Sequence, residues 1–144
     1  MTERTDLEQL AKIVTAMPGF TKASGMQVDL VEPGRAHLSL KRREDLLQFN
    51  GFFHGGIISG LADHAAGGAA STVLAPGKIA VTADLHVNFL APADGDTLLA
   101  RAEVVQSGKV ISVVRVDVVS LRGEEERLCA IATAMLRTVD MPRG

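Results

Sequence analysis

A single carboxylate, Asp63, lies in a long stretch of small and apolar residues that begins at two adjacent glycines, Gly55 and Gly56. Between Gly55 and Gly77 the only side chains able to carry charge are Asp63 and His64. Backbone N–H groups at the start of a helix suit an oxygen that gains negative charge during a reaction. A lone acid inside an apolar helix costs stability unless it has a use. Together these residues indicate a reaction site.

The elements that must position this site can be assigned from hydrophobic periodicity. Apolar residues recur at helical spacing over residues 7–17, and Pro18-Gly19 ends that helix. Two strands, 26–31 and 36–40, flank a turn that contains Pro-Gly and form a hairpin. The stretch 55–74 is too long for a strand, so it is predicted to be a helix, weakened by its glycines and held by packing.

The second half of the chain has the period-two pattern of strands. Val81, Ala83, Leu85, Val87 and Phe89 alternate with Thr82, Asp84, His86 and Asn88, which places the two sets on opposite faces of one strand. Three more strands follow at 97–105, 110–120 and 127–138, with turns at Gly108 and Gly123. Strands joined in series by hairpins form an antiparallel sheet, and one long helix on its face gives an α+β fold.

Composition excludes several classes of protein. The 144 residues predict one domain, and the formal charge of −2 and the aromatic content of 3% are unlike those of a nucleic-acid-binding protein. Cys129 is expected to be a buried, inert thiol, and the four scattered histidines indicate no metal site. Without a signal peptide or a membrane span, the expectation is a cytoplasmic protein. We expect an N-terminal helix within 1–19, a single domain over 20–140 and a tail at 141–144.

Three segments resemble the hotdog-fold thioesterases that act on coenzyme A esters, specifically the phenylacetic-acid-degradation (PaaI-like) family. The first runs from Asn50 through Phe53-His54-Gly55-Gly56 to Asp63, the second is the strand 82–92, and the third is the turn Gly108-Lys109. The resemblance covers about residues 20–138. It implies a hotdog fold, in which an antiparallel sheet wraps a long central helix, and hydrolysis of an acyl-CoA or aryl-acyl-CoA thioester to a free acid and coenzyme A.

The resemblance also implies roles for individual residues. Asp63 is the catalytic carboxylate, as nucleophile or as general base on water. The backbone N–H of Gly56, or of its neighbour Gly55, holds the thioester carbonyl. His54 shapes that loop, and Thr82 contacts the water or the acid.

The sequence does not decide which side-chain amide orients the water. Several relatives carry an asparagine six residues before the histidine, where this chain has Gln48, whereas Asn50 lies four residues before it. The residues expected to bind substrate are Gly55, Phe53, His86, Gly108 and Lys109. His86 could instead belong to a solvated strand face and Gly108-Lys109 to a simple hairpin turn, while His37 and His64 are expected at the surface.

Helix geometry adds an inference about assembly. Asp63 follows the glycines by seven or eight residues, about 10–12 Å along a helix that rises 1.5 Å per residue. It cannot reach a carbonyl held at the start of its own helix. We therefore expect a homodimer with a shared active site, in which Asp63 and Thr82 of one chain face Gln48, Asn50, His54 and Gly56 of the other, and a dimer of such dimers.

Two alternatives differ in class from the thioesterase. One is a hotdog hydratase or dehydratase, whose differently spaced motif fits the Gly-Gly after His54 poorly. The other is a non-catalytic acyl-CoA-sensing module, which usually needs an attached DNA-binding segment. The residues before position 20 are too few and not basic enough for that segment. No cofactor is expected, since coenzyme A enters as part of the substrate.

Overall fold

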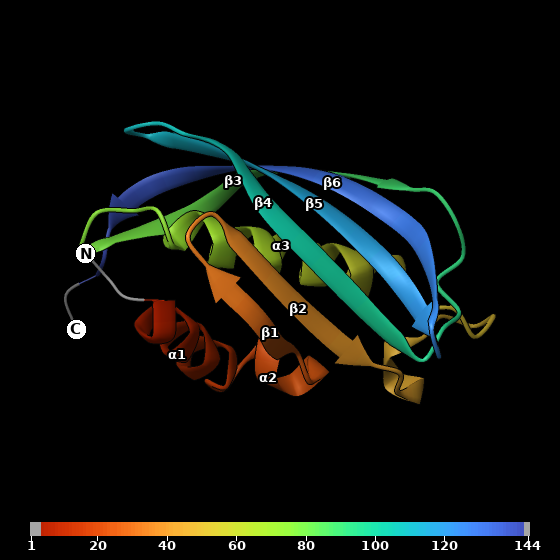
Figure 1. The fold of residues 1–144 in the computed structure, drawn as a ribbon. Coiled ribbons are helices and arrows are strands. Elements are labelled where there is room, and N and C mark those ends of the chain that lie inside the picture. Colours follow the sequence, from red (N-terminus) through yellow and green to blue (C-terminus); the bar gives the residue numbers. More distant parts are fainter. Residues whose placement is uncertain (1–3, 143–144) are drawn as a thin grey trace.

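The computed structural model of the protein describes residues 4–142. One six-stranded antiparallel sheet curves around a single long helix, and two shorter helices lie beside it (Figure 1). This is the α+β hotdog arrangement that the sequence predicted. Within the described residues, no helix is long and apolar enough to cross a bilayer.

The elements follow the predicted ranges with ends that differ by a few residues. The helices are α1 (Arg4–Thr15), α2 (Phe20–Ser24) and α3 (Gly55–Ser71), with a 3₁₀ turn at Glu44–Leu46. The strands are β1 (Gln27–Glu32), β2 (Arg35–Lys41), β3 (Lys78–Phe89), β4 (Thr97–Ser107), β5 (Ile111–Arg122) and β6 (Glu125–Asp140). The short α2 and the 3₁₀ turn had no sequence signal, because segments this short do not complete a hydrophobic period.

The order of strands across the sheet is β1-β2-β4-β5-β6-β3. The β1–β2, β4–β5 and β5–β6 pairs are the expected hairpins, and Gly34 and Gly123 adopt positive φ angles of 81° and 59° in two of their turns. The expectation that β3 also pairs with the next strand is wrong. Strand β3 pairs with β6 instead and forms one edge of the sheet. Adjacency across the sheet is a long-range property that local pattern does not encode.

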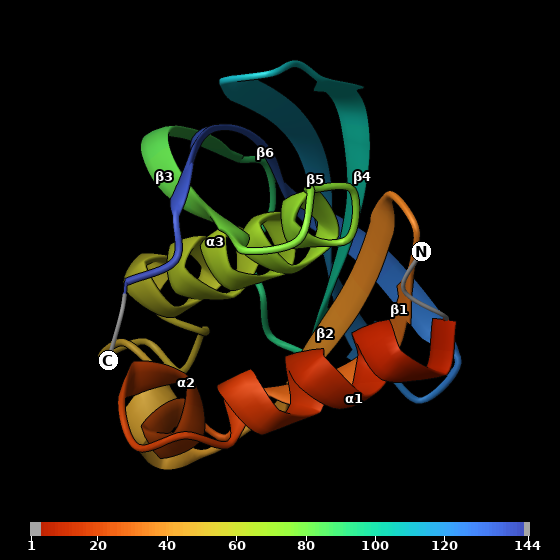
Figure 2. The same cartoon turned by 90° about the vertical axis from the view of Figure 1, so that its left-hand side faces the viewer.

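Helix α3 lies along the inner face of the sheet (Figure 2). It can approach closely because both surfaces carry small side chains. From the helix, Ala62, Ala65, Ala66 and Ala69 are each fully buried. From β6, the residues predicted to leave room for a helix are at most 4% exposed: Ala130, Ala132 and Ala134. Packing without long side chains therefore holds a helix whose glycine content alone would disfavour it.

A β-bulge in β3 changes which face its side chains occupy. The register with β6 shifts between Thr82 and Asp84, so Ala83 has no partner. One extra residue reverses the alternation. Ala80 and Leu85 therefore both pack toward the core, on either side of the bulge, while Val81 is exposed. The predicted single apolar face over 81–89 is wrong for the first half of the strand.

Candidate active site

The Asp63 carboxylate meets Thr82 on the inner face of the sheet. The Thr82 hydroxyl donates a hydrogen bond of 2.7 Å to Asp63 Oδ1. This contact depends on the bulge at Ala83, which turns Thr82 toward α3 and away from the face that simple alternation predicts. Both side chains are half-buried. The pairing expected from the family resemblance is present, and a mid-helix acid is held in one orientation by a strand.

His54 caps the start of α3. Its backbone is extended, and its Nδ1 accepts a hydrogen bond of 2.8 Å from the Gly56 N–H. A neutral ring that accepts at Nδ1 carries its proton on Nε2. The Gly56 N–H, one of the two amides expected to hold a carbonyl, is thus already occupied within the chain. Sequence reasoning missed this, because histidine is not among the usual capping residues.

The neighbouring amide is open. The Gly55 N–H has no hydrogen-bond acceptor within residues 4–142. A Cβ placed on Gly55 would lie 3.3 Å from the Phe89 ring, so this aromatic side chain packs over the glycine. Phe89 ends β3 and is itself more than half exposed. The first turn of α3 therefore presents one unpaired donor beside an exposed ring.

The loop before α3 holds the two side-chain amides that could orient water, those of Asn50 and Gln48, in different ways. The Asn50 Oδ1 accepts from the Phe52 N–H at 3.2 Å, which closes a turn where Gly51 has a positive φ of 84°. The half-buried Gln48 side chain has no such bond within the described part of the chain, although its backbone N–H donates to Phe52 O. Phe53, expected to bind substrate, is only 1% exposed and packs in the core.

His64 is not the surface residue that the sequence predicted. It is half-buried, and its Nε2 lies 2.9 Å from the Thr15 hydroxyl at the end of α1. Burial lowers the pKa of His64, and the neighbouring Asp63 carboxylate opposes that shift only in part. The prediction failed because it did not place α1 beside α3, where Thr15 covers the ring.

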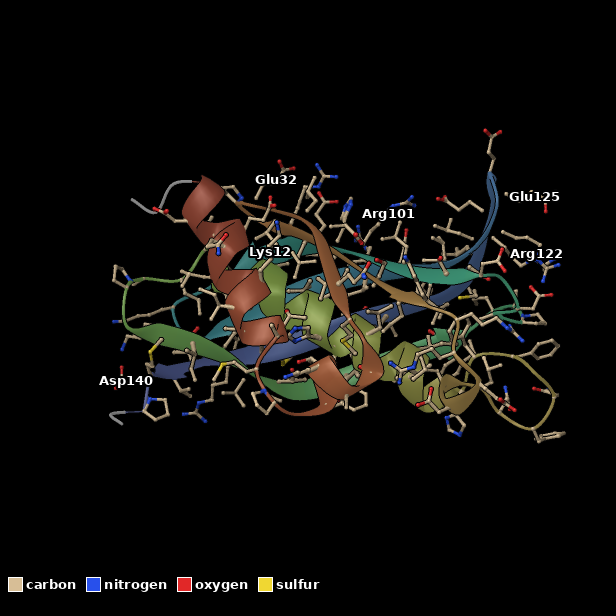
Figure 3. All side chains as sticks on the ribbon, turned by 90° about the horizontal axis from the view of Figure 1, so that it is seen from below. Lys12, Glu32, Arg101, Arg122, Glu125 and Asp140 are labelled. Atoms are coloured by element: carbon tan, nitrogen blue, oxygen red, sulfur yellow. The ribbon has the colours of Figure 1, made fainter. Side chains whose placement is uncertain are left out.

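The remaining predicted residues lie apart from Asp63. His86 is exposed on β3 beyond the bulge. Gly108 and Lys109 form the exposed β4–β5 turn, where the Gly108 N–H donates to Ile111 O. The labelled charged side chains in Figure 3, among them Arg101, lie at the periphery of the molecule and not between sheet and helix. Arg101 is paired with Glu126 at 2.6 Å.

The described residues also bear on thiol and metal chemistry. Cys129 is fully buried, its thiol donates to Val118 O, and burial raises its pKa to about 11, as expected of an inert thiol. Among residues 4–142, no three His, Cys, Asp or Glu side chains gather into a group that could hold a metal ion.

An apolar pocket of about 330 Å³ lies between α1, α3 and the inner face of the sheet. Its volume is within the range of small-molecule sites, roughly 300–1,000 Å³. Helix α3 contributes His64, Gly67, Gly68 and Ser71, its C-cap Thr72 follows, and β3 contributes Ile79 and Ala80. Asp63 and Thr82 do not line the pocket themselves, but the lining residue His64 follows Asp63 and Ala80 lies two positions before Thr82. The sequence did not reveal this pocket.

Asp63 and the open Gly55 N–H do not meet within one chain. Both belong to the continuous helix α3, in which eight residues separate them by about 12 Å of axial rise. The structure thus provides a positioned carboxylate at one place and an unpaired amide donor at another. Each half has the chemistry of acyl transfer, and neither half is complete alone.

Comparison with known proteins shows the family of the chain. Residues 50–127, more than half of the chain, match the thioesterase superfamily. The chain is 30% identical over 114 residues to the 1,4-dihydroxy-2-naphthoyl-CoA hydrolase of Listeria monocytogenes, an alignment that covers 79% of this chain and 90% of that protein.

Solved structures show the same architecture. A thioesterase family protein from Silicibacter pomeroyi superimposes with a TM-score of 0.89 at 32% identity, covering 94% of this chain and 99% of that one. A mutant of the phenylacetic acid degradation protein PaaI from Thermus thermophilus gives 0.72 at 30% identity, covering 82% and 96%. Fold and site together define a hotdog enzyme that hydrolyses thioesters. The chain belongs to the thioesterase superfamily.

Proposed function

We propose that this protein hydrolyses an acyl-CoA thioester with Asp63 as nucleophile or general base and with the Gly55 N–H as donor to the carbonyl oxygen. The observation that carries the proposal is the Asp63–Thr82 hydrogen bond, which fixes a half-buried carboxylate in one orientation. A carboxylate so placed can attack a carbonyl carbon or deprotonate water. The thiolate of coenzyme A then leaves with the electron pair of the C–S bond.

The amide donor is Gly55 and not Gly56. The Gly56 N–H is bonded to His54 Nδ1, whereas the Gly55 N–H is open and lies at the positive end of α3. An oxyanion held there gains both a hydrogen bond and the field of the helix. His54 acts on this donor indirectly, because its cap fixes the first turn of the helix.

Gln48 is the better candidate to orient water. The amide oxygen of Asn50 already closes its own turn, so using it would break a local hydrogen bond. Gln48 precedes that turn and is half-buried. The assignment rests on which amide is free.

A complete site then needs two chains. Strand β3 pairs only with β6 among the described strands, so one long edge of the sheet is open (Figure 1). Pairing of two such edges about a two-fold axis would set the α3 helices antiparallel and bring Asp63 of one chain toward Gly55 of the other. Long exposed edges are otherwise a liability, which favours their being covered.

The test is a mixed dimer of two defective chains, Asp63→Asn and Gly55→Pro. Proline is favoured at the first position of a helix, and the extended His54 backbone permits it, so Gly55→Pro removes the N–H and adds a ring whose Cβ lies near Phe89. Each variant alone should lose at least about 100-fold in rate. A mixed dimer, purified through two different tags, should recover activity with acyl-CoA esters in a thiol-release assay.

The control reverses the arrangement. One wild-type chain paired with a chain carrying both substitutions should be inactive if sites are shared, and half-active if each chain holds its own. Gly55→Ala keeps the N–H and should lose far less than Gly55→Pro, which separates loss of the donor from crowding against Phe89. The shared site would be refuted by activity in the dimer of a wild-type chain with a doubly substituted chain, together with no activity in the dimer of an Asp63→Asn chain with a Gly55→Pro chain.

A further inference from the structure

We infer that the pocket between α1 and α3 binds the apolar tail of the acyl group. The inference rests on the proposed function, which places the thioester carbonyl at Asp63. It adds the direction in which the acyl group runs and the chemistry that it must have.

The helix itself points from the carboxylate into the pocket. Asp63, Gly67 and Ser71 are spaced four residues apart and therefore share one stripe of α3. Gly67 and Ser71 both line the pocket. The sheet contributes a lining residue as well. Ala80 lies two positions before Thr82 in β3, on the same side of the bulge. An acyl tail that leaves a carbonyl at Asp63 thus enters directly along this stripe.

The pocket has free space next to Gly67. A Cβ built on Gly67 would have no heavy atom within 4 Å outside its own helix backbone and its chain neighbours. At Gly68, on the adjacent stripe, a Cβ would meet Ala36 at ordinary contact distance, 3.4 Å. Gly67 is therefore where a side chain would fill the pocket without displacing anything.

Each hydroxyl that lines the pocket already has a protein partner. Thr15 bonds to His64 Nε2, Ser71 donates to Gly67 O, and Thr72 donates to Ala69 O. Thr72 also accepts from the Gly34 N–H. An aliphatic tail can therefore contact these groups without breaking any hydrogen bond of the protein.

The rest of the lining is aliphatic. It comes from α1, β1, β2 and β3: Leu7, Leu10, Ala11, Val14, Val28, Val31, Leu38, Ile79 and Ala80. Leu10 and Val14 are more than half exposed and leave this side open to entry. With the pKa of His64 lowered by burial, the pocket carries no charge near neutral pH. These features favour a saturated aliphatic tail.

The test compares chain lengths in wild type and Gly67→Leu. The measured quantity is the ratio of kcat/KM for decanoyl-CoA to that for butanoyl-CoA. Gly67→Leu should lower this ratio at least about tenfold, because a leucine displaces several methylenes of the longer chain. Gln9→Leu adds the same side chain to an exposed position of α1 outside the pocket and should leave the ratio unchanged. An unchanged ratio in Gly67→Leu overturns the inference while the proposed function stands.

Binding of the free acid separates the pocket from the reaction. Calorimetry should show decanoate binding to wild type and to Asp63→Asn, with at least about tenfold weaker binding to Gly67→Leu. If no ester is hydrolysed but decanoate binds in this Gly67-dependent way, the proposed function fails and the pocket inference stands. Equal binding by wild type and Gly67→Leu overturns it.

Discussion

At the scale of single residues, one hydroxyl holds the carboxylate to which we assign the reaction. Thr82 is the only described side chain whose hydrogen bond to Asp63 is observed, at 2.7 Å. A carboxylate on a helix has several accessible rotamers, and a hydrogen bond from a rigid strand selects one of them. Thr82 therefore acts as a positioning residue for Asp63.

Thr82→Val should lower kcat/KM about 10- to 100-fold, because a hydrogen bond to a charged group contributes roughly 1.5–3 kcal/mol. Valine keeps the shape and β-branching of threonine, so the fold should persist. Thr82→Ser retains the hydroxyl and should restore most of the rate. The rates are compared in steady-state assays, with the melting temperature of each variant as the control for folding. A rate for Thr82→Val equal to that of wild type would remove Thr82 from the mechanism.

At the scale of elements, the start of α3 depends on an unusual cap. His54 Nδ1 satisfies the Gly56 N–H, and the next residues, Ile57 and Ile58, both bond to His54 O. The helix has glycine at its first two positions, where conformational entropy opposes folding. A defined cap therefore matters more here than in an alanine-rich helix.

His54→Ala should destabilise the protein by about 1 kcal/mol, in the range of 0.5–2 kcal/mol found for lost caps. His54→Asn should recover much of this, since asparagine is a strong capping residue. Both are measured by denaturant unfolding. A stability of His54→Ala equal to that of wild type would show that the cap contributes nothing, and a deficit in His54→Asn as large as in His54→Ala would assign the loss to the imidazole ring.

Most elements were predictable because each carries its own periodic signal. The alternating pattern of β4, β5 and β6 and the apolar length of α3 gave their positions and the α+β class. Three features escaped. The bulge at Ala83 leaves the sequence alternation intact, so only the register with β6 reveals it. The pairing of β3 with β6 and the contact of Thr15 with His64 join residues far apart in sequence.

The candidate site was predicted in part for the same reason. Asp63 and the two glycines stood out locally, as an acid and flexible backbone in an apolar stretch. Which of the two glycine N–H groups is free depends on a histidine cap, and histidine is not a residue that helix N-caps usually favour. The apolar pocket depends on how α1 packs beside α3, and amphipathic periodicity gives the existence of α1 but not its location.

At the scale of the whole molecule, the free energy of unfolding depends on pH through His64, which joins α3 to the end of α1. The pKa of His64 is lowered, mainly by burial, so the unfolded chain binds a proton more readily than the folded one. This contribution to stability is present above the ordinary pKa of about 6.5 and is lost as the pH falls through the lowered folded value. His37 acts in the same direction, through burial and the neighbouring Arg35 and Arg101.

The free energy of unfolding should therefore decrease between pH 7.5 and pH 5.5, and the decrease should be smaller in His64→Gln. Glutamine can still meet the Thr15 hydroxyl but does not titrate. Urea unfolding at both pH values gives the difference, and His37→Gln is the matched control for the other histidine. If His64→Gln loses as much stability as wild type over this range, His64 is not a source of the pH dependence.

The close approach of α3 to β6 has a consequence for how such an enzyme can change. The interface is made of alanines, which have almost no side chain to shorten and no space to lengthen. Substitutions there would lift the helix from the sheet rather than reshape a cavity. If the acyl tail binds where we infer, new substrate preferences would instead arise in the pocket lining, at Gly67 and at the leucines and valine of α1, while the alanine interface remains as it is.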